Sequence, residues 1–553
     1  MGQRQRSRSP RRPAPTRPAQ PAAGPSEWIG AAIIGIATLL AYIPSLDGRF
    51  ILDDIILLTE NPLIHAPDGL YRFWFTTEPI DYWPVFNTTF WLEWRLWGTN
   101  PTGYHITNIL LHVINALLIW AVLKALSIPG GFVAALLFAL HPVNVESVAW
   151  ISQRKGLLAT LFFLLSILCY LRTERRDGRG DDDHTARWYA LSLALFVLAM
   201  LSKGSVAVLP VLLLGIVWWR RPLTGGDLAR TAPFFAVAAA LVGVTIWFQA
   251  RGGHETAETP ALIERLLGAG AVVWFYLYKA VAPFRLAFIY PQWDIQPANL
   301  AWWLPSIIAL GVTAMLWWYR SSWSRPLLFA WGFFCVALAP VMGISRVTFM
   351  EFSLVADHYP YIALIAVVAL AAAAWKTWRE RAGGSTRRAA DALAVAVVLL
   401  LAVLTWRQSG LYADSITLYR ASLESSPTAS MAHNNLSAEF FDAGQVSEAM
   451  EHARRALELK PDYAEAHNNL GNALSQAERI PEAIEHYRRA LELKPTYVRA
   501  HNNLGSALAF TGHIEEGIVH FQEALRLDPD YDEARTNLDV ALGLRRNKGA
   551  QDE

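Results

Sequence analysis

Charged residues are scarce in this sequence of 553 residues. Only 17% are Asp, Glu, Lys or Arg, whereas soluble proteins usually carry about a quarter. The deficit lies in residues 28–406, where apolar blocks alternate with short polar stretches, and charge returns after residue 410. The net charge of +1 therefore averages two environments. This distribution indicates a membrane domain followed by a soluble region.

Cysteine is nearly absent as well, and both copies, Cys169 and Cys335, lie inside apolar blocks. This excludes a disulfide framework and a zinc site built on cysteine pairs. The sequence also has no P-loop, GxGxxG, GxSxG or HExxH motif. Nothing therefore indicates ATP hydrolysis, nicotinamide chemistry or a zinc protease. It lacks a basic face interleaved with aromatic residues, so we predict no nucleic-acid partner.

Residues 1–27 form a basic Arg/Pro-rich tail that cannot build a core, and we expect it to be disordered. The apolar run at 28–46 is longer than the core of a secretory signal. We interpret it as an uncleaved first span, with the arginines in the cytoplasm.

Apolar blocks of the length of a membrane span recur along residues 28–406, predicted here as one transmembrane domain. The candidates are 28–46, 105–127, 129–142, 156–171, 188–202, 204–219, 231–250, 263–283, 301–319, 327–344, 359–376 and 390–406.

Basic loops decide the topology, because Lys and Arg favour the cytoplasmic side. Twelve spans would place the basic stretches 320–325 and 376–388 outside. We therefore predict that 263–283, which carries three charged residues, does not cross. About eleven spans remain, with a long outer loop at 47–104, the N-terminus in the cytoplasm and the C-terminus outside.

The region 410–545 repeats every 34 residues, which is the period of tetratricopeptide (TPR) repeats. His433-Asn-Asn-Leu recurs at His467 and His501, and Pro427, Pro461, Pro495 and Pro529 keep the same step. The predicted fold class is all-α: a polytopic helical domain followed by a TPR solenoid. Residues 546–553 are expected to form a polar tail.

One asparagine per repeat lies in phase on the first helix, the helix that lines the concave face of a TPR superhelix. These are Asn435, Asn469, Asn503 and Asn537. A carboxamide both donates and accepts hydrogen bonds, so such a ladder can hold the main chain of a peptide. The alternative is a local structural bond within each repeat.

Ionisable residues at membrane depth are functional hypotheses. Asp53 and Asp54 follow the first span within an apolar run, and either could act as a general base. The alternative is an interfacial acidic pair or a helix cap.

Three further groups fall on the predicted outer side, and all are candidates for holding a phosphate. The first comprises His141, Glu146, Arg154 and Lys155, the second is Lys203, and the third comprises Asp357, His358 and Tyr359. A metal at His141 and Glu146 lacks a visible third ligand, so metal use stays open. The alternative for Arg154 and Lys155 is an interfacial, snorkelling pair.

Two segments resemble a known family. The stretch from His141 to Lys155, HPVNVESVAWISQRK, and the stretch ADHYPY at 356–361 are similar to motifs of the TMTC proteins. These are membrane O-mannosyltransferases with TPR repeats. The Asp53-Asp54 pair followed by Asn61-Pro62 resembles the opening of GT-C glycosyltransferases. The resemblance covers most of the chain from about Phe50 onward.

The resemblance implies an inverting transfer of a mannose-like sugar from a polyprenyl-phosphate carrier to Ser or Thr of a protein, outside the cytoplasm. One of Asp53 and Asp54 would deprotonate the acceptor, and the TPR array would hold the acceptor polypeptide. No cofactor is certain, and a divalent metal stays undecided. The tail and short loops are typical of a bacterial inner-membrane protein. Gly156 and Gly204 stand where the family often has acidic residues, so the implied activity depends on the remaining groups.

Two other functions were weighed. A membrane-anchored TPR scaffold for envelope or pilus assembly would explain the repeats, but it requires one span only. A transporter or polysaccharide ligase would explain the many spans, although no inverted repeat is evident.

Overall fold

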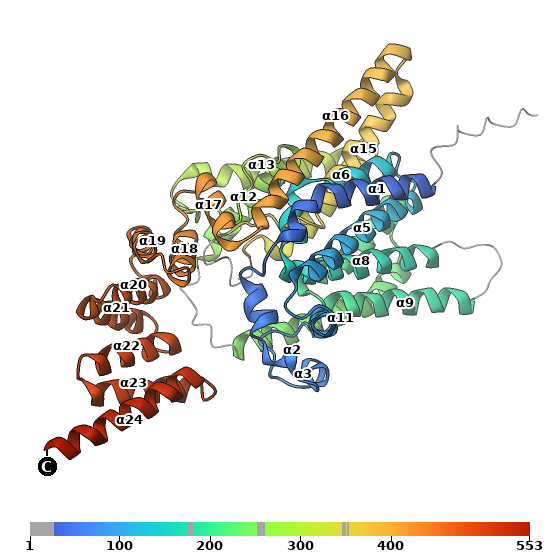
Figure 1. The fold of residues 1–553 in the computed structure, drawn as a ribbon. Helices are drawn as coiled ribbons and strands as arrows, with labels where there is room; N and C mark the ends of the chain where they lie inside the picture. Colours follow the sequence, from blue (N-terminus) through green and yellow to red (C-terminus); the bar gives the residue numbers. More distant parts are fainter. Residues whose placement is uncertain (1–26, 175–181, 252–259, 345–349, 351–352, 553) are drawn as a thin grey trace, which may run out of the picture.

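The computed structural model describes residues 27–174, 182–251, 260–344, 350 and 353–552. These residues contain helices and connecting segments and no strand, so the all-α prediction is confirmed. The predicted tail 1–27 lies outside the described residues except for Glu27. The chain forms a helical bundle, from which the carboxy-terminal helices project as a separate arm (Figure 1).

The amino-terminal bundle contains long helices and a set of short ones. The long helices are α1 (Glu27–Tyr42), α5 (Pro101–Ala125), α8 (Arg154–Thr173), α9 (Asp182–Met200), α10 (Leu209–Arg220), α11 (Gly225–Arg251), α12 (Leu262–Val281), α13 (Trp303–Trp318), α14 (Arg325–Leu338), α15 (Leu364–Arg381) and α16 (Gly384–Ser409). The other helices are α2 (Pro62–His65), α3 (Gly69–Phe75), α4 (Pro84–Trp97), α6 (Gly131–Ala139) and α7 (Val145–Ala149). Six of the described helical segments are long and apolar enough to cross a membrane, or seven if the bent pair α6–α7 is one span.

The bundle has two chemically different ends. At one end, which we call the site end, Val85 N donates to Leu201 O over 3.4 Å, and the rings of Tyr82 and Phe248 stack at 5.1 Å. The other, basic end carries arginines and lysines at helix termini: Lys124, Arg172, Arg221, Arg325 and Arg379. Basic residues gathered at one end are what the positive-inside rule expects of the cytoplasmic side.

Helix α12 does not connect the two ends. Near its start, Arg265 Nε donates to Gly343 O over 3.4 Å, and near its end Tyr276 bonds the backbone of Ala356 through its hydroxyl. Both partners lie in the 343–363 connection at the site end. This arrangement supports the expectation that 263–283 lies along the membrane surface, which stays a prediction.

The predicted span 129–142 is shorter and ends in a break. Helix α6 stops at Ala139, and the chain bends by 52° into the segment Pro142–Ala149. Pro142 explains the break, since a residue before proline disfavours helical angles. The freed carbonyls of residues 138–140 accept bonds from side chains, namely Asn144, His112 and Thr405. Such a break is tolerated at membrane depth only where the carbonyls are bonded.

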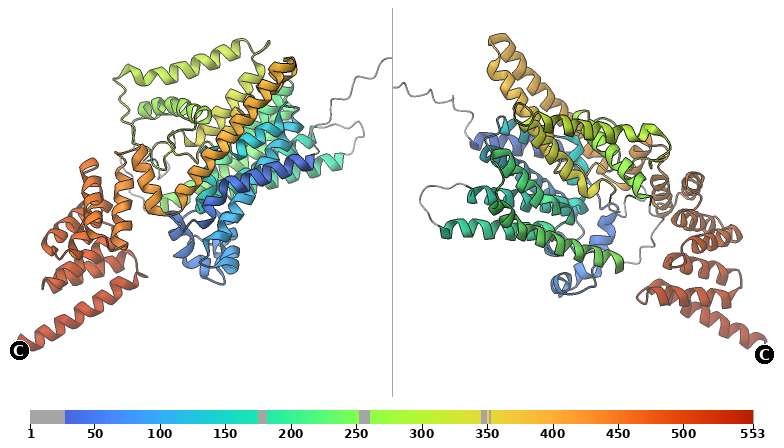
Figure 2. Two further views of the ribbon diagram at one scale, coloured as in Figure 1. Left: turned by 45° about the horizontal axis from the view of Figure 1, so that its top comes forward. Right: turned by 180° about the vertical axis from the view of Figure 1, so that it is seen from behind.

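The predicted TPR array is present as stacked antiparallel helix pairs (Figure 2). Its helices are α17 (Ser415–Ser425), α18 (Ser430–Asp442), α19 (Val446–Leu459), α20 (Ala464–Gln476), α21 (Ile480–Leu493), α22 (Val498–Phe510), α23 (Ile514–Leu527) and α24 (Asp532–Asp552). Ala449, Ala483 and Gly517 are buried where paired helices approach closely. Helix α24 runs to Asp552, so the residues expected to form a polar tail continue the last helix.

The array is joined to the bundle without a flexible linker. A short 3₁₀ turn, Gly410–Tyr412, follows α16, and Arg49 N donates to Ala413 O over 2.9 Å. One hydrophobic core contains both Tyr42 and Ile51 of the bundle and Leu418 and Leu436 of the array. The first helices of the array are therefore part of the bundle's packing.

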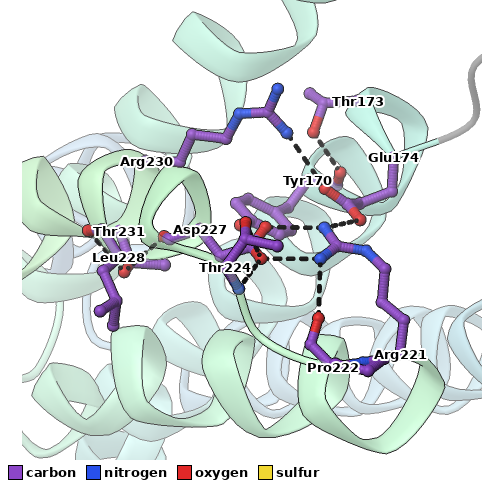
Figure 3. Close-up of polar contacts among 10 residues, drawn as sticks. All are labelled: Tyr170, Thr173, Glu174, Arg221, Pro222, Thr224, Asp227, Leu228, Arg230 and Thr231. Carbon is purple, nitrogen blue, oxygen red and sulfur yellow. Dashed lines mark hydrogen bonds and ion pairs between the residues drawn. The ribbon is translucent and has the colours of Figure 1, made fainter.

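A polar clasp closes the basic end between α8, α10 and α11 (Figure 3). Arg221 donates to both carboxylate oxygens of Asp227, at 2.6 and 2.7 Å, and to Glu174 at 2.8 Å. Thr224 adds its N–H and hydroxyl to Asp227, both at 2.8 Å. Asp227 is 2% exposed, so its charge is stabilised by these donors.

Replacing Asp227 by Ala should lower the stability of the bundle. Arg221 and the Thr224 N–H would lose their acceptor, which costs about 1–3 kcal/mol. The measurement is thermal unfolding of the purified protein in detergent micelles. The matched control is Glu380→Ala, whose exposed pair with Lys376 at 3.1 Å should be worth under about 0.5 kcal/mol. Equal melting temperatures for the two variants would contradict a stabilising role for the clasp.

Candidate active site at the site end of the bundle

The adjacent carboxylates Asp53 and Asp54 have different environments. Asp54 is fully buried; its Oδ1 accepts from Ser152 N at 2.8 Å and from the Ser152 hydroxyl, and its Oδ2 accepts from Ile51 N at 3.1 Å. Asp53 is half-buried and makes none of these bonds. Asp54 therefore fixes the loop to the segment before α8, which leaves Asp53 as the accessible carboxylate.

Arg154 has a similar fixing role. Its Nε donates to Asn108 Oδ1 at 2.8 Å, Nη2 donates to Tyr104 O at 2.9 Å, and Nη1 pairs with Glu93. The side chain is 0% exposed. All three guanidinium nitrogens are occupied, so the structure places Arg154 inside the packing of α4, α5 and α8, away from a ligand.

A cationic group lies on the other side of this segment. Lys155 is largely buried against the ring of Trp83, with Nζ 4.5 Å from its centroid. Lys203 Nζ comes within 3.8 Å of the position that a Cβ on Gly156 would occupy. Both ammonium groups are close enough to His358 to lower its pKa, in addition to burial, which is the largest cause. Two amino groups thus meet near the start of α8, where burial and the charge of Lys155 lower the pKa of Lys203 to about 7.

Glu146 and His358 form a buried pair beside these lysines. Glu146 Oε1 and His358 Nδ1 are 2.6 Å apart, so one proton is shared between them. Glu146 Oε2 has no hydrogen-bond partner among the described residues. The Glu146–His358 pair therefore joins α7 to the segment that precedes α15.

The remaining predicted residues surround this pair. Asp357 Oδ1 accepts from Tyr290 OH at 2.9 Å, and burial raises the pKa of this carboxyl. The ring of Tyr359 lies edge-on to His358, with centroids 4.5 Å apart. His141 instead caps the turn that follows it and bonds Ala280 O through Nε2 at 3.1 Å. It therefore holds α12 in place. It is separate from Lys155 and Lys203, which we call the lysine group.

An aromatic row leads from His358 to the TPR array. Trp150 lies 5.9 Å from His358 and 5.3 Å from Phe288, and Phe288 lies 6.3 Å from Tyr419 of α17 (centroid distances). The negative charge of Asp53 is close enough to Tyr419 to contribute to the raised pKa of that phenol, although burial is the main cause. Trp150, Phe288 and Tyr419 therefore connect His358 to the first helix of the array by ring contacts.

The two glycines that depart from the family pattern leave room beside Lys203. A Cβ on Gly156 would meet only Lys203 Nζ, at 3.8 Å, and a Cβ on Gly204 would meet only Thr245 Oγ1, at 3.7 Å. Both are ordinary van der Waals distances, so neither glycine is required by packing. Because no acidic side chain stands at these two positions, Lys203 keeps Glu146 as the carboxylate that acts on its pKa.

The asparagine ladder of the array is an inter-repeat chain of hydrogen bonds. Asn469 Nδ2 donates to Asn434 Oδ1 at 2.9 Å, Asn503 Nδ2 to Asn468 Oδ1 at 3.0 Å, and Asn537 Nδ2 to Asn502 Oδ1 at 2.9 Å. The first rung is different, because Asn435 Nδ2 donates to Tyr419 OH at 2.9 Å. The amide donors are thus engaged within the array, and the carbonyl oxygens of Asn469 and Asn503 remain as acceptors at a groove.

This groove, the TPR groove, has a volume of about 1060 Å³. It is lined mainly by amide, hydroxyl and aromatic side chains, among them Asn469, Asn472, Asn503, Ser506, Tyr497 and Phe510. Such a lining suits an extended polar main chain better than a compact apolar ligand.

No group of three or more His, Cys, Asp and Glu side chains in the described part of the chain could hold a metal ion. The structure therefore offers no ligand set from which a metal role could be derived.

Several site residues were not found from the sequence. Ser152 lies inside the family-like stretch, but nothing in its spacing indicated a bond to Asp54. Lys279 is buried near Asp357 and donates to Arg285 O at 2.8 Å. The charge of Lys279 within an apolar segment contributed to the predicted topology. It could also have marked this residue as part of the site. Tyr419 carried no signal.

Replacing Asp54 by Asn should destabilise the protein in a pH-dependent way. Asn keeps one acceptor for Ser152 but presents an NH₂ to the N–H of Ile51, which costs about 1–3 kcal/mol. Burial raises the pKa of Asp54 to about 7, above the value of about 3.9 in an unfolded chain. Proton binding therefore stabilises the fold at low pH, and this contribution is lost as pH rises through 7.

The measurement is thermal unfolding in micelles between pH 5 and pH 8. The melting temperature of the wild type should exceed that of Asp54→Asn most at pH 5, and the difference should narrow by pH 8. A difference that widens with pH would show that the buried carboxyl is held ionised.

Comparison with protein families gives three matches. Residues 78–248 match the family "Dolichyl-phosphate-mannose-protein mannosyltransferase". Residues 438–477 and 471–512 match the family "TPR repeat", and residues 498–531 match "Tetratricopeptide repeat". The mannosyltransferase match covers α4 to most of α11, and Asp53 lies before it.

Several curated relatives are named protein O-mannosyl-transferases. A protein O-mannosyl-transferase of Caenorhabditis elegans is 25% identical over 447 residues, which cover 74% of this chain and 60% of that protein. TMTC4 of Mus musculus is 32% identical over 219 residues, covering 33% of this chain and 29% of that protein. TMTC1 of Homo sapiens is 36% identical over 190 residues, covering 31% and 22%. The chain therefore spans less than two thirds of the length of each of these relatives.

Solved structures match in the array. The crystal structure of MamA protein is 24% identical, with a TM-score of 0.23, and the match covers 25% of this chain and 73% of that one. The first TPR domain of Spaghetti (RPAP3), bound to an HSP90 peptide, is 19% identical with a TM-score of 0.21, covering 21% and 93%. The family matches and the relatives show that this chain is similar to protein O-mannosyl-transferases, including TMTC proteins, and that its carboxy-terminal part is a TPR array.

Proposed function

We propose that this protein is a membrane glycosyltransferase that moves a mannose-like sugar from a polyprenyl-phosphate carrier to Ser or Thr of a polypeptide. The observation that carries the proposal is the difference between the environments of Asp53 and Asp54 at the site end. Both carboxylate oxygens of Asp54 accept hydrogen bonds that hold the loop in place. Its neighbour Asp53 stays accessible, in the loop that is bonded to the start of the TPR array. The printed names of the relatives, protein O-mannosyl-transferases, support the same reaction class.

In the proposed reaction, Asp53 is the general base. The hydroxyl oxygen of the acceptor attacks the anomeric carbon of the sugar from the face opposite the phosphate, and the bond from that carbon to the phosphate oxygen breaks. The electron pair leaves with the lipid phosphate, the acceptor proton passes to Asp53, and the anomeric configuration is inverted. A half-buried carboxylate can accept this proton in the transition state, which contributes about 10²–10⁴-fold to such reactions.

The lysine group is the proposed site for the phosphate of the carrier. Lys203 and Lys155 supply positive charge, and charge-assisted bonds to phosphate are strong in a partly desolvated site. The Glu146–His358 pair, together with Asp357 and Tyr359, orients these cations and the sugar. The polyprenyl chain would lie among the membrane helices, since apolar surface is abundant on the outside of the bundle.

The TPR groove is the proposed binding site for the acceptor polypeptide. Carbonyl oxygens of Asn469 and Asn503 face a peptide as acceptors for its main-chain N–H groups. We place the site end and the array outside the cytoplasm and the N-terminus inside, in a bacterial inner membrane. The basic residues gathered at the other end of the bundle support this orientation.

Asp53→Asn should abolish transfer and leave the fold intact. The expected loss in kcat is about 10²-fold or more, because the amide cannot take the acceptor proton. The assay is transfer from a synthetic polyprenyl-phosphate mannose to Ser/Thr-containing peptides, with melting temperatures recorded for every variant. Asp47→Asn, an exposed position in the same loop, is the matched control. Full activity of Asp53→Asn, or no transfer by the wild type with any donor, would overturn the proposal.

Lys203→Ala should weaken binding of the lipid donor without affecting binding of the acceptor peptide. Loss of one phosphate contact is expected to raise the KM for the lipid donor about 10-fold, which corresponds to about 1.4 kcal/mol. Lys124→Ala, an exposed lysine at the basic end, is the control. An unchanged donor KM in Lys203→Ala would remove this residue from the phosphate site.

A further inference from the structure

The junction between the bundle and the TPR array is rigid. Ser409 Oγ, at the end of α16, donates to Ala41 O over 3.2 Å, and Asp414 caps α17 by accepting from the N–H and hydroxyl of Thr417, both at 2.8 Å. The residues between them form a 3₁₀ turn bonded to the loop after α1. The connection is thus bonded at both of its ends and, through Ala413, to the loop after α1.

The first rung of the asparagine ladder continues this rigid path into the array. Tyr419 packs in the same core as the bundle and accepts from Asn435 on α18. Asn434 then donates to Asn435 and accepts from Asn469 on α20, and the bond between repeats recurs from Asn503 to Asn468 and from Asn537 to Asn502. Arg49 N bonds Ala413 O, and Ile51 shares a core with Tyr419. The loop that carries Asp53 is therefore fixed to the junction, and the TPR groove stands at a fixed distance from the accessible carboxylate.

From this geometry we infer that the enzyme measures its substrate: the modified Ser or Thr lies at a set number of residues from the segment held in the TPR groove. The inference rests on the proposed function. Adjacent helices are about 10 Å apart, and the middle of the groove, between α20 and α22, is two to three helices from α17. An extended chain covers about 3.3 Å per residue, so the offset is about 6–9 residues.

The groove also limits what can be held there. Its lining is dominated by uncharged amides and hydroxyls, with Asp442, Glu478, Glu533 and Arg499 as the charged members. Recognition by main-chain acceptors tolerates many side chains but requires an extended strand-like segment. The partner is therefore an extended, uncharged polypeptide region rather than a folded domain, and position rather than local sequence selects the hydroxyl.

Three equivalent positions allow a direct test. They are the last residues of the first helix in three successive repeats: Asp442 of α18, Gln476 of α20 and Phe510 of α22. Neighbouring positions are 34 residues apart, and all three line the groove. Each is changed singly to Cys in a full-length chain whose Cys169 and Cys335 are replaced by Ala. An unstructured Ala/Gln/Gly peptide with one Thr is attached through a thioether at either peptide end, with the Thr placed 2 to 20 residues from the tether. Transfer from polyprenyl-phosphate mannose is read by mass spectrometry.

The expected result is one optimum for each tether. The optimum should move outward by about 3 residues with each repeat, because one helix width of about 10 Å is spanned by about three extended residues. A flat profile, or the same optimum at all three tethers, would overturn the inference while leaving the proposed function standing. No transfer at any tether and none to free peptides would instead be a failure of the proposed function.

A loosened junction supplies the second measurement. An eight-residue Gly/Ser insertion after Ala413 should broaden the dependence of transfer on the Thr position at all three tethers. The same insertion at Gly383, in the exposed turn between α15 and α16, should leave a separate optimum for each tether. A stepped profile that survives the insertion after Ala413 would contradict the role of the junction. The three tethers in the uninterrupted chain decide the inference even if that insertion variant does not fold.

Discussion

The contact between Asp54 and Ser152 organises the site end of this protein. A buried carboxylate that accepts three hydrogen bonds joins the loop after α1 to the segment that begins α8. The loop is thereby held against the bundle, and Asp53, which precedes Asp54, is left half-buried. Because a buried carboxylate without its donors is costly, the loop has one favourable position, and the geometry of the neighbouring groups follows from it.

The membrane imposes the second constraint. Backbone groups at membrane depth need partners within the protein, and the break between α6 and α7 obtains them from His112, Asn144 and Thr405. The break in turn brings Glu146 to His358 and positions the start of α8, with its lysine, toward the site end. A non-helical segment inside the bundle is therefore the means by which the cationic group and the acidic pair come together.

The sequence predicted the architecture well, for physical reasons. Charge scarcity, the span-length blocks and the 34-residue period each report on a solvent or a packing repeat, so the all-α membrane domain and the TPR array followed from them. The roles of individual residues followed less well. Asp53 and Asp54 are identical in chemistry and adjacent in sequence, and only the three-dimensional contacts with Ile51 and Ser152 distinguish them. Arg154 and His141 looked like ligand-binding groups because the partners that occupy them, Glu93 and the Ala280 carbonyl, are distant in the chain.

The ladder of asparagines has an evolutionary consequence. Each rung after the first makes the same bond to the repeat before it, whereas the first rung alone, Asn435 to Tyr419, is made to α17, the helix of the array that packs into the core of the bundle. Duplication or loss of a 34-residue unit behind that rung would change the length of the groove without disturbing the joint. Selection could thus adjust the reach of the arm by gene duplication, while the membrane part and its chemistry stay unchanged.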